Sequence, residues 1–338
     1  MILIVSQEDE PNVDAVERVL EQRRAEYLRF NTEAFPLSSS LVLRDPGQQP
    51  TGHLCVAGRR IALDQISTVW YRRRGPFRLV GGLSESEHTF IDRECLAALN
   101  GLWSILPCFW VNDPMRQRDA ANKVLQLKIA RDVGLQTPRT LITNDPDEVL
   151  RFYERCGGRV IFKITSGQAI FTAQERREPQ EPGLNLLNGG AIYTNLLNQD
   201  DLGKLESVRY APVLFQEYVP KQYELRITIV GRRLFSAAIY SQDAPSEQTR
   251  IDWRRYDLAH TPHRRHELRP EIAHGLCELM ERSGLAFGCV DMIVTPDDRY
   301  VFLENNPSGQ YQWIEHLVGF PITETLADML IRGRIAEL

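Results

Sequence analysis

The sequence predicts a mixed α/β protein with an N-terminal α/β layer and a C-terminal antiparallel sheet. Its 338 residues are enough for two or three packed units, because domains usually contain about 100–200 residues. The apolar segment 2–5, the amphipathic segment 12–24 and the apolar segment 27–31 are typical of a consecutive strand, helix and strand. Near the other end, the alternating segments 223–231 and 233–239 meet at a tight turn, as in a β-hairpin.

The composition excludes several classes of protein. Hydrophobic residues make up 43% of the chain and charged residues 25%, as in ordinary globular proteins. The net charge of −5 gives no general attraction to nucleic acid or to an anionic membrane surface. No apolar run approaches the ~20 residues of a membrane span, and the N-terminus has no basic region of a signal peptide. We therefore expect a cytoplasmic protein whose six scattered cysteines are reduced.

Further elements are expected between the two ends of the chain. Recurring apolar residues predict helices at 84–106, 119–134, 271–283 and 320–331. Asp145 and Pro146 open another helix as its cap and first residue. Pro and Gly turns separate short strands at 41–44, 53–56, 59–63 and 68–71. We expect an N-terminal domain (1–114), a central domain (115–212) and a C-terminal domain (213–338).

The segment 289–309 predicts a hairpin with hard oxygen ligands at one end. An apolar strand, a Pro-Asp-Asp turn and a returning apolar strand follow one another. Alternation places Glu304 and Asn306 on one face, and the antiparallel return can bring Asp291 opposite them. Three oxygen side chains without Cys or His favour Mg²⁺ over Zn²⁺. The alternative is an ordinary solvated turn with a polar strand end.

Two lysines and one arginine are candidates for phosphate chemistry. Lys163 ends the apolar run 160–163, and Lys123 lies near the start of the helix expected at 119–134. Lys123 could instead belong to a solvated helix face. Arg226 shares the polar side of its alternating strand with Glu224. That side is either a solvent face or a place where the guanidinium binds phosphoryl oxygens.

Two other polar clusters invite a functional interpretation. His260, His263 and His266 are spaced by three, but Pro262 and the flanking arginines argue against a metal site. Three consecutive arginines follow the strand expected at 68–71. These are Arg72, Arg73 and Arg74. They form either a solvated strand end or a site that binds an anion or an acidic peptide.

Three of these segments, in this order, resemble the ATP-grasp fold: Val160–Lys163 with Ser166 and Gly167, Val213–Pro220, and the Asp291…Glu304-x-Asn306 hairpin. The resemblance implies that Lys163 with Ser166 and Gly167, and Lys123, bind the phosphates of ATP. It implies that the backbone of a hinge reads adenine, and that Glu224 meets the ribose. It also assigns catalytic roles to Lys163 and Arg226. The hinge residues are Gln216, Glu217, Tyr218 and Val219.

A narrower resemblance covers almost the whole chain. Val-Trp-Tyr-Arg-Arg and segments 126–144, 215–221 and 303–311 are similar to the microviridin-type ligases, the graspetide synthetases. One departure is Asn305, where Val is usual; the ligand positions are intact. The resemblance implies an ADP-forming ligase that forms a homodimer and uses ATP and Mg²⁺ as cofactors. Its implied substrate is a ribosomal precursor peptide, cross-linked through side-chain esters or amides.

Two alternatives stay open at this point. One is an ATP-grasp ligase that adds amino acids to a protein terminus or a small acid. The other is a non-catalytic nucleotide-binding partner subunit, against which the intact Lys, Arg and metal positions argue.

The resemblance also implies that a leader segment of the peptide docks on the central domain, at 191–209. Leucines at 196, 197, 202 and 205 suggest either an apolar groove or an ordinary surface helix with inward leucines. The polar residues around them are Tyr193, Asp200, Asp201, Lys204 and Arg209.

Overall fold

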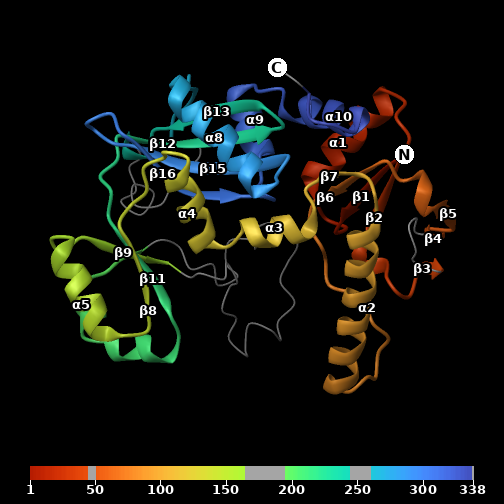
Figure 1. The fold of residues 1–338 in the computed structure, drawn as a ribbon, viewed down its shortest axis with the longest axis horizontal. Helices are drawn as coiled ribbons and strands as arrows, with labels where there is room; N and C mark the ends of the chain where they lie inside the picture. The colour runs from red at the N-terminus through yellow and green to blue at the C-terminus, as the bar shows by residue number, and fades with distance from the viewer. Residues whose placement is uncertain (45–50, 164–194, 244–259, 337–338) are drawn as a thin grey trace.

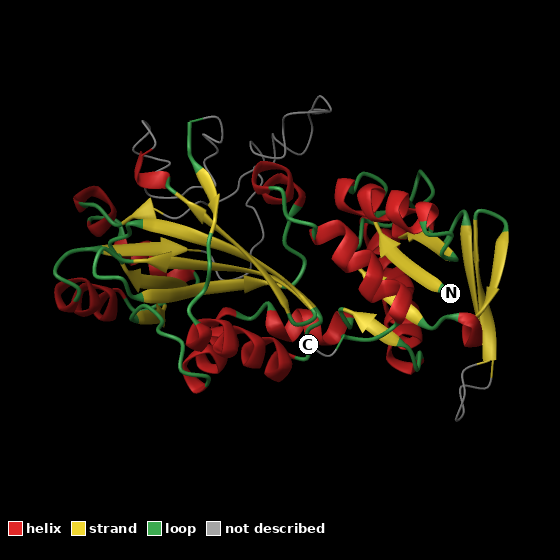
Figure 2. Cartoon of the chain, turned by 90° about the horizontal axis from the view of Figure 1, so that it is seen from above, coloured by secondary structure: helices red, strands yellow, loops and turns green. Residues whose placement is uncertain are grey.

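The computed structural model describes residues 1–44, 51–163, 195–243 and 260–336. Three parts are visible in Figure 1: an N-terminal part in red and orange, a central part in yellow and green, and a C-terminal part in teal and blue. The large C-terminal sheet and the N-terminal sheet stand side by side in Figure 2. The mixed α/β architecture is the one expected from the sequence.

The N-terminal part is built on a parallel sheet. Its strand order is β2-β1-β6-β7, and β1 is buried from end to end, with four apolar residues before Ser6. Helix α2 begins at Glu85, directly after Ser84, whose side chain forms a capping box with Glu87. A separate antiparallel sheet, β3-β4-β5, lies at the outer edge (Figure 2). The elements are β1 Ile2–Ser6, α1 Pro11–Gln22, β2 Tyr27–Asn31, η1 Thr32–Ala34, β3 Ser39–Arg44, β4 Thr51–Val56, β5 Arg59–Ala62, η2 Leu63–Gln65, β6 Thr68–Tyr71, α2 Glu85–Ile105 and β7 Phe109–Val111.

The central part contains the antiparallel sheet β10-β9-β11-β8. Strand β11 was expected in the C-terminal domain, but it pairs with β8 and β9. The helix expected at 119–134 is also different: it begins at Lys123, because the Asn122 side chain caps the backbone N–H groups of Val124 and Leu125. The elements are α3 Pro114–Ala120, α4 Lys123–Asp132, β8 Thr140–Thr143, α5 Pro146–Arg155, β9 Val160–Lys163, β10 Asn195–Leu196, α6 Gln199–Leu202, η4 Leu205–Tyr210 and β11 Val213–Glu217.

The C-terminal part contains the five-stranded antiparallel sheet β14-β13-β12-β15-β16. Both hairpins expected from the sequence, β12–β13 and β15–β16, are present. Helix α8 ends at Gly284, whose φ of +65° suits glycine. The elements are β12 Tyr223–Val230, β13 Arg233–Ile239, η5 Ser241–Asp243, β14 His263–Arg265, α8 Pro270–Ser283, β15 Phe287–Val294, β16 Tyr300–Asn306, α9 Gln312–Val318 and α10 Ile322–Arg332.

One apolar core joins the two ends of the chain. Val13 and Val16 of α1 share it with Leu326 and Leu330 of α10, and all four side chains are fully buried. Burial on this scale contributes roughly 1.5–3 kcal/mol per side chain. The N-terminal part is therefore held against the C-terminal sheet. Within the described residues, no helix combines the length and hydropathy that crossing a bilayer requires.

Candidate active site

The β15–β16 hairpin brings two of the expected metal ligands face to face. Asp291 on β15 is paired directly with Glu304 on β16. Asn306 lies two residues further along β16, opposite Cys289, and therefore on the same face as Glu304. The three oxygen-bearing side chains thus lie at one end of the hairpin, as the alternation predicts.

A β-bulge in β16 decides which side chains face the site. Met292 pairs with Phe302 and the next pair is Asp291 with Glu304, so Leu303 is the extra residue. Strict alternation would put Phe302 and Glu304 on one face. Because of the bulge, Phe302 is fully buried in the apolar core while Glu304 turns to the opposite face with Asp291.

Arg226 occupies the middle of the site. The register of β12 places it opposite Asp291. Its Nη1 donates to Oδ1 of Asp291 over 3.0 Å, and its Nη2 donates to the backbone oxygen of Gln310 over 2.9 Å. Burial alone would lower the pKa of Arg226, but the charge of Asp291 outweighs it and the pKa is raised. The guanidinium is therefore a permanent, preoriented cation beside the expected metal ligands.

The expected metal ligands fit a divalent cation chemically. Asp291 and Glu304 offer carboxylate oxygens and Asn306 an amide oxygen, which are the hard donors that Mg²⁺ prefers. Glu304 forms an ion pair with Lys123, the first residue of α4. Each carboxylate is thus balanced by a cationic side chain of the protein, as a site rich in negative charge requires.

The other expected nucleotide ligands occupy separate elements. Lys163 ends β9, opposite Leu214 of β11, and is partly exposed. Ser166 and Gly167 lie outside the described residues. Glu224 is buried on β12, where it pairs with Lys221 and accepts a hydrogen bond from Oγ of Ser241. Its expected role toward ribose stays a prediction.

The expected hinge spans the end of β11 and the two residues after it. Oε1 of Glu217 accepts from the backbone N–H of Arg139 over 2.9 Å, and the N–H of Tyr218 donates to the carbonyl of Arg159. Gln216 is buried and donates through Nε2 to Thr140. A cavity of about 270 Å³ is lined in part by Glu217, Tyr218, Val219 and Pro220. Adenine recognition by this segment remains a prediction.

The three arginines after β6 are not equivalent. The Arg72 side chain is 1% exposed and contacts Glu10 and Gln310, so it is neither a solvated strand end nor a peptide contact. This corrects the expectation for Arg72, which was based on sequence neighbours alone. Arg73 and Arg74 are 39% and 31% exposed and remain accessible to a ligand.

Three of the four leucines of the expected docking surface face inward. Leu197 and Leu205 are buried and share a core with Phe152 of α5, and Leu202 packs against it. An apolar groove made by these leucines is therefore wrong, and the ordinary inward-facing packing is correct. The acidic and basic residues between them lie at the surface or partly exposed; Tyr193 lies outside the described residues. These are Asp200, Asp201, Lys204 and Arg209.

The three spaced histidines do not converge. His263 lies in β14 against the ring of Trp313, whereas His266 makes a 2.9 Å hydrogen bond with the hydroxyl of Tyr300. No group of three His, Cys, Asp or Glu side chains within the described ranges is arranged to hold a metal ion.

Sequence reasoning missed the polar residues of the N-terminal part and of α3 that reach this site. Asn12, Asn112 and Gln117 contact the loop 307–311 that follows β16. Gln310 in that loop contacts Arg72. A polar residue next to an apolar run, such as Asn112 after Val111, was the available signal, but its partners lie nearly 200 residues away.

Comparison with known structures assigns the family. The macrocyclase MdnC of Microcystis aeruginosa, solved with its precursor peptide MdnA, shares 32% identity with this chain and a TM-score of 0.84. The alignment covers 98% of this chain and 99% of MdnC. This chain belongs to the RiPP ATP-grasp macrocyclases. This chain also matches the family model of the MvdD pre-ATP grasp domain over residues 1–118.

Two further structures extend the comparison. A RiPP-associated ATP-grasp ligase of Chryseobacterium gregarium was solved in complex with ADP and a leader and core peptide. It is 29% identical to this chain, with a TM-score of 0.84 and 99% coverage of both chains. The ATP-grasp ligase PsnB, complexed with minimal precursor, Mg and ADP, shares the fold at 23% identity and a TM-score of 0.75, over 98% and 96% of the chains. A search of curated protein sequences gave no match.

Proposed function

We propose that this macrocyclase activates Asp or Glu side chains of a ribosomal precursor peptide with ATP and joins them to Ser or Thr hydroxyls or Lys amines. The products are macrocyclic esters or amides, ADP and phosphate. The observation that carries the proposal is the buried Arg226 between Asp291 and the loop after β16, in a chain 32% identical to a peptide-bound macrocyclase. The ADP-bound relative supports a nucleotide site.

The residues divide the work of the first step. A peptide carboxylate oxygen attacks the γ-phosphorus of ATP, and the bond to ADP breaks, which gives an acyl phosphate. Arg226 and Lys163 offset the charge on the transferred group, and Lys123 assists at the phosphates. Mg²⁺ held by Asp291, Glu304 and Asn306 would supply further charge neutralisation at the phosphates.

The second step needs geometry more than acid or base strength. A hydroxyl or amine of the same peptide attacks the acyl carbon, phosphate leaves, and the proton of the nucleophile passes to the departing phosphate. Because both groups belong to one bound peptide, the reaction is effectively unimolecular, which is worth up to ~7–11 kcal/mol of the barrier.

The rest of the proposed nucleotide site follows the fold family. The hinge Gln216–Val219 contacts adenine, Glu224 lies toward the ribose, and Ser166 and Gly167 follow the phosphate lysine. We also propose a three-domain division at 1–114, 115–212 and 213–338, in which β11, at the start of the third range, pairs with the central sheet.

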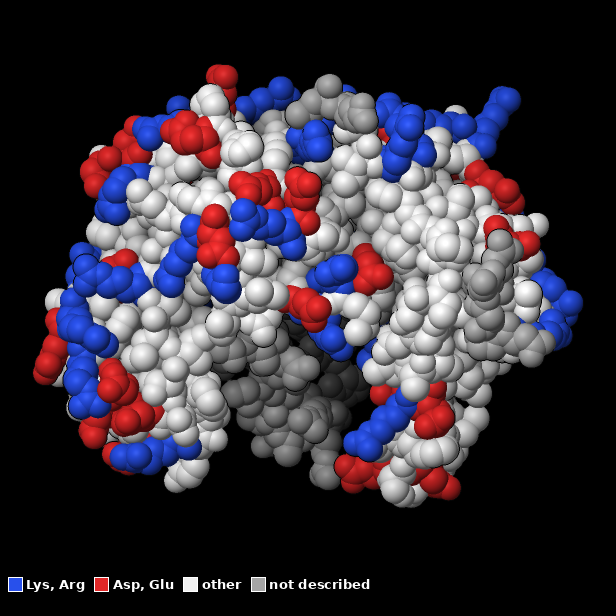
Figure 3. Space-filling view, viewed as in Figure 1, with Lys and Arg blue, Asp and Glu red and all other residues white. Residues whose placement is uncertain are grey.

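Peptide contacts are proposed at two places. Arg73 and Arg74 offer accessible cations to the acidic core. The polar surface around Lys204 and Arg209, with Asp200 and Asp201, holds the leader together with Tyr193. On the face shown in Figure 3, lysines and arginines are interspersed with acids, which suits a peptide of mixed charge.

The test is mass spectrometry of precursor peptides incubated with the macrocyclase, ATP and Mg²⁺. Loss of one water per ring, with matching ADP release, is the expected result. A mass gain of one amino acid would support a ligase for free amino acids, and no change with any acidic Thr- or Lys-containing peptide would support a partner subunit without catalysis.

The oligomeric state and the cellular location are proposed from the similarity to the family. We propose a homodimer, which light scattering of the purified protein tests directly. We also propose a cytoplasmic location, since the reaction consumes ATP; cell fractionation would test it.

A further inference from the structure

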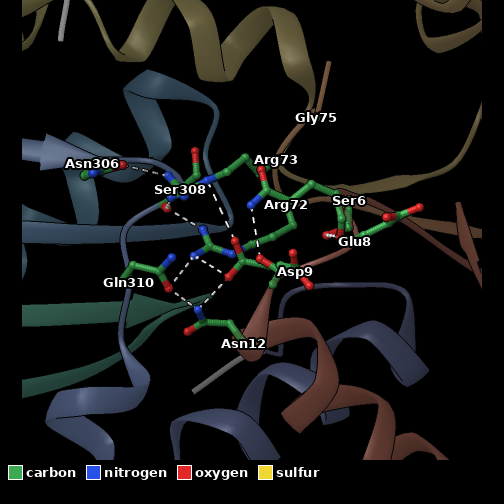
Figure 4. A network of polar contacts seen from close by, with 12 residues as sticks. Ser6, Glu8, Asp9, Asn12, Arg72, Arg73, Gly75, Asn306, Ser308 and Gln310 are labelled. Carbon is green, nitrogen blue, oxygen red and sulfur yellow. Dashed lines mark hydrogen bonds and ion pairs between the residues drawn. The ribbon is translucent and has the colours of Figure 1, made fainter. Parts of the chain in front are cut away.

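The loop after β16 is fixed from both sides by polar contacts. Five side chains from the first 122 residues reach it: Asn12, Arg72, Arg73, Asn112 and Gln117. Figure 4 shows how Arg72 and Asn12 converge on Gln310, and how Ser308 lies between Arg73 and Asn306. The N-terminal part thus holds a segment that lies directly beside the expected metal ligands.

Arg72 is the centre of this network. Its Nη1 donates to the carbonyl of Ser308, and its Nη2 donates to Oε1 of Gln310 over 3.1 Å and to Glu10 over 3.4 Å. Arg72 and Glu10 are each 1% exposed. Burial lowers the pKa of Arg72, with Glu10 opposing the effect. A buried charge of this kind is costly unless paired, so its geometry is tightly determined.

The other side of the loop contacts the site itself. The carbonyl of Gln310 accepts from Nη2 of Arg226, and the backbone N–H of Ser308 donates to Oδ1 of Asn306 over 3.0 Å. Gly309 between them packs directly on Arg226, since a Cβ there would lie 2.8 Å from its Nη2. The loop therefore transmits the position of Arg72 to a catalytic arginine and to an expected metal ligand.

We propose that Arg72 is a positioning residue that orients Arg226 and Asn306 through Ser308 and Gln310. The proposal rests on the proposed function, because it concerns the same ATP and metal site. The N-terminal domain then contributes to catalysis, because the site has its active geometry only while that domain holds the loop 307–311 in place. The guanidinium fork, and not charge alone, makes the two contacts.

One variant removes the Gln310 contact of Arg72 and a second removes the whole link, and neither leaves a buried charge unpaired. Gln310→Met removes the side-chain acceptor at an exposed residue and keeps the backbone carbonyl that Arg226 contacts. The double variant Arg72→Met with Glu10→Gln removes both buried charges together. The matched control is Arg23→Ala, which removes an ion pair between α1 and Asp328 of α10, another contact of the N-terminal part with the C-terminal part.

The measurement is the affinity for ADP by calorimetry across a Mg²⁺ series, together with kcat on a precursor peptide. We expect both link variants to raise the Mg²⁺ concentration for half-maximal ADP affinity about tenfold and to lower kcat at least tenfold, the scale of one lost hydrogen bond to a charged group. ADP affinity without Mg²⁺ and the thermal midpoint should change little in Gln310→Met, and Arg23→Ala should match the unaltered chain.

Three results would overturn the proposal. The Mg²⁺ dependence and kcat of Gln310→Met could be unchanged, or its stability alone could fall, in which case the network is only structural. Arg23→Ala could reproduce the loss, so that any interdomain contact would serve. If the unaltered chain bound no ADP in Mg²⁺, the proposed function itself would fail, and the positioning role with it.

Discussion

Alanine in place of Gly309 would collide with the floor of the site. An ideal Cβ at this position lies 2.4 Å from Cβ of Cys289, 2.7 Å from its Sγ and 2.8 Å from Nη2 of Arg226. Carbon atoms in contact are normally about 3.5–4.0 Å apart, so something must move by roughly 1 Å. Cβ of Cys289 is fixed inside β15, and Arg72 holds the loop from its other side. Moving the Arg226 guanidinium relieves only the third of these contacts, so the loop must also shift away from Cys289 and take with it the Gln310 carbonyl that Arg226 contacts.

Two measurements follow from this collision. Overpacking of a tight site costs about 1–3 kcal/mol in the free energy of unfolding. Losing a preorganised donor to the transition state lowers the rate by about 10²-fold or more. We expect Gly309→Ala to show both effects in thermal unfolding and in ADP release with a precursor peptide.

Gly101→Ala is the matched control for this prediction. Gly101 lies on an exposed part of α2, and a Cβ there meets nothing within 4 Å. Alanine should stabilise this helix by about 0.5–1 kcal/mol and leave the rate unchanged. Unchanged ADP release and stability in Gly309→Ala would refute the close packing of the loop on Arg226.

Three further predictions concern the proposed roles. Alanine at any of the proposed metal ligands Asp291, Glu304 and Asn306 should abolish ADP release, while circular dichroism shows an intact fold. Turnover retained with all three replaced would disprove the metal site. Arg226→Ala should slow turnover by about 10²-fold or more with a smaller loss of ATP affinity, and an equal loss of both would make it a ground-state ligand. Lys204→Glu with Arg209→Glu should weaken binding of full-length precursor and spare a leader-free core peptide at high concentration, since docking raises only the effective concentration; equal impairment of both substrates would contradict leader docking there.

The hairpin and the β-α-β opening could be predicted because their signals are local. Alternation and the Pro-Asp-Asp turn define β15 and β16, and the register then pairs Asp291 with Glu304. The bulge at Leu303 left no such signal, because it depends on which side chain the core accepts. The start of α4 was missed because the apolar spacing extends upstream of the Asn122 cap.

Long-range pairing limited the prediction of the site. Arg72 appears solvent-exposed among neighbouring arginines, but its partners Glu10 and Gln310 are 62 and 238 residues away in the chain. The leucines at 197 and 205 have a spacing that suits either a groove or a core, and only the packing of α5 beside them decides it. Such choices depend on tertiary neighbours that no local pattern encodes.

The shared core of α1 and α10 has a consequence for synthesis of the chain. Chains emerge from the ribosome N-terminus first, and early domains generally fold as units. Here Val13 and Val16 can be covered only by Leu326 and Leu330, which are synthesised about 300 residues later. The N-terminal part therefore carries an uncovered apolar helix face until α10 has been made, and truncation before α10 would leave that face open to aggregation.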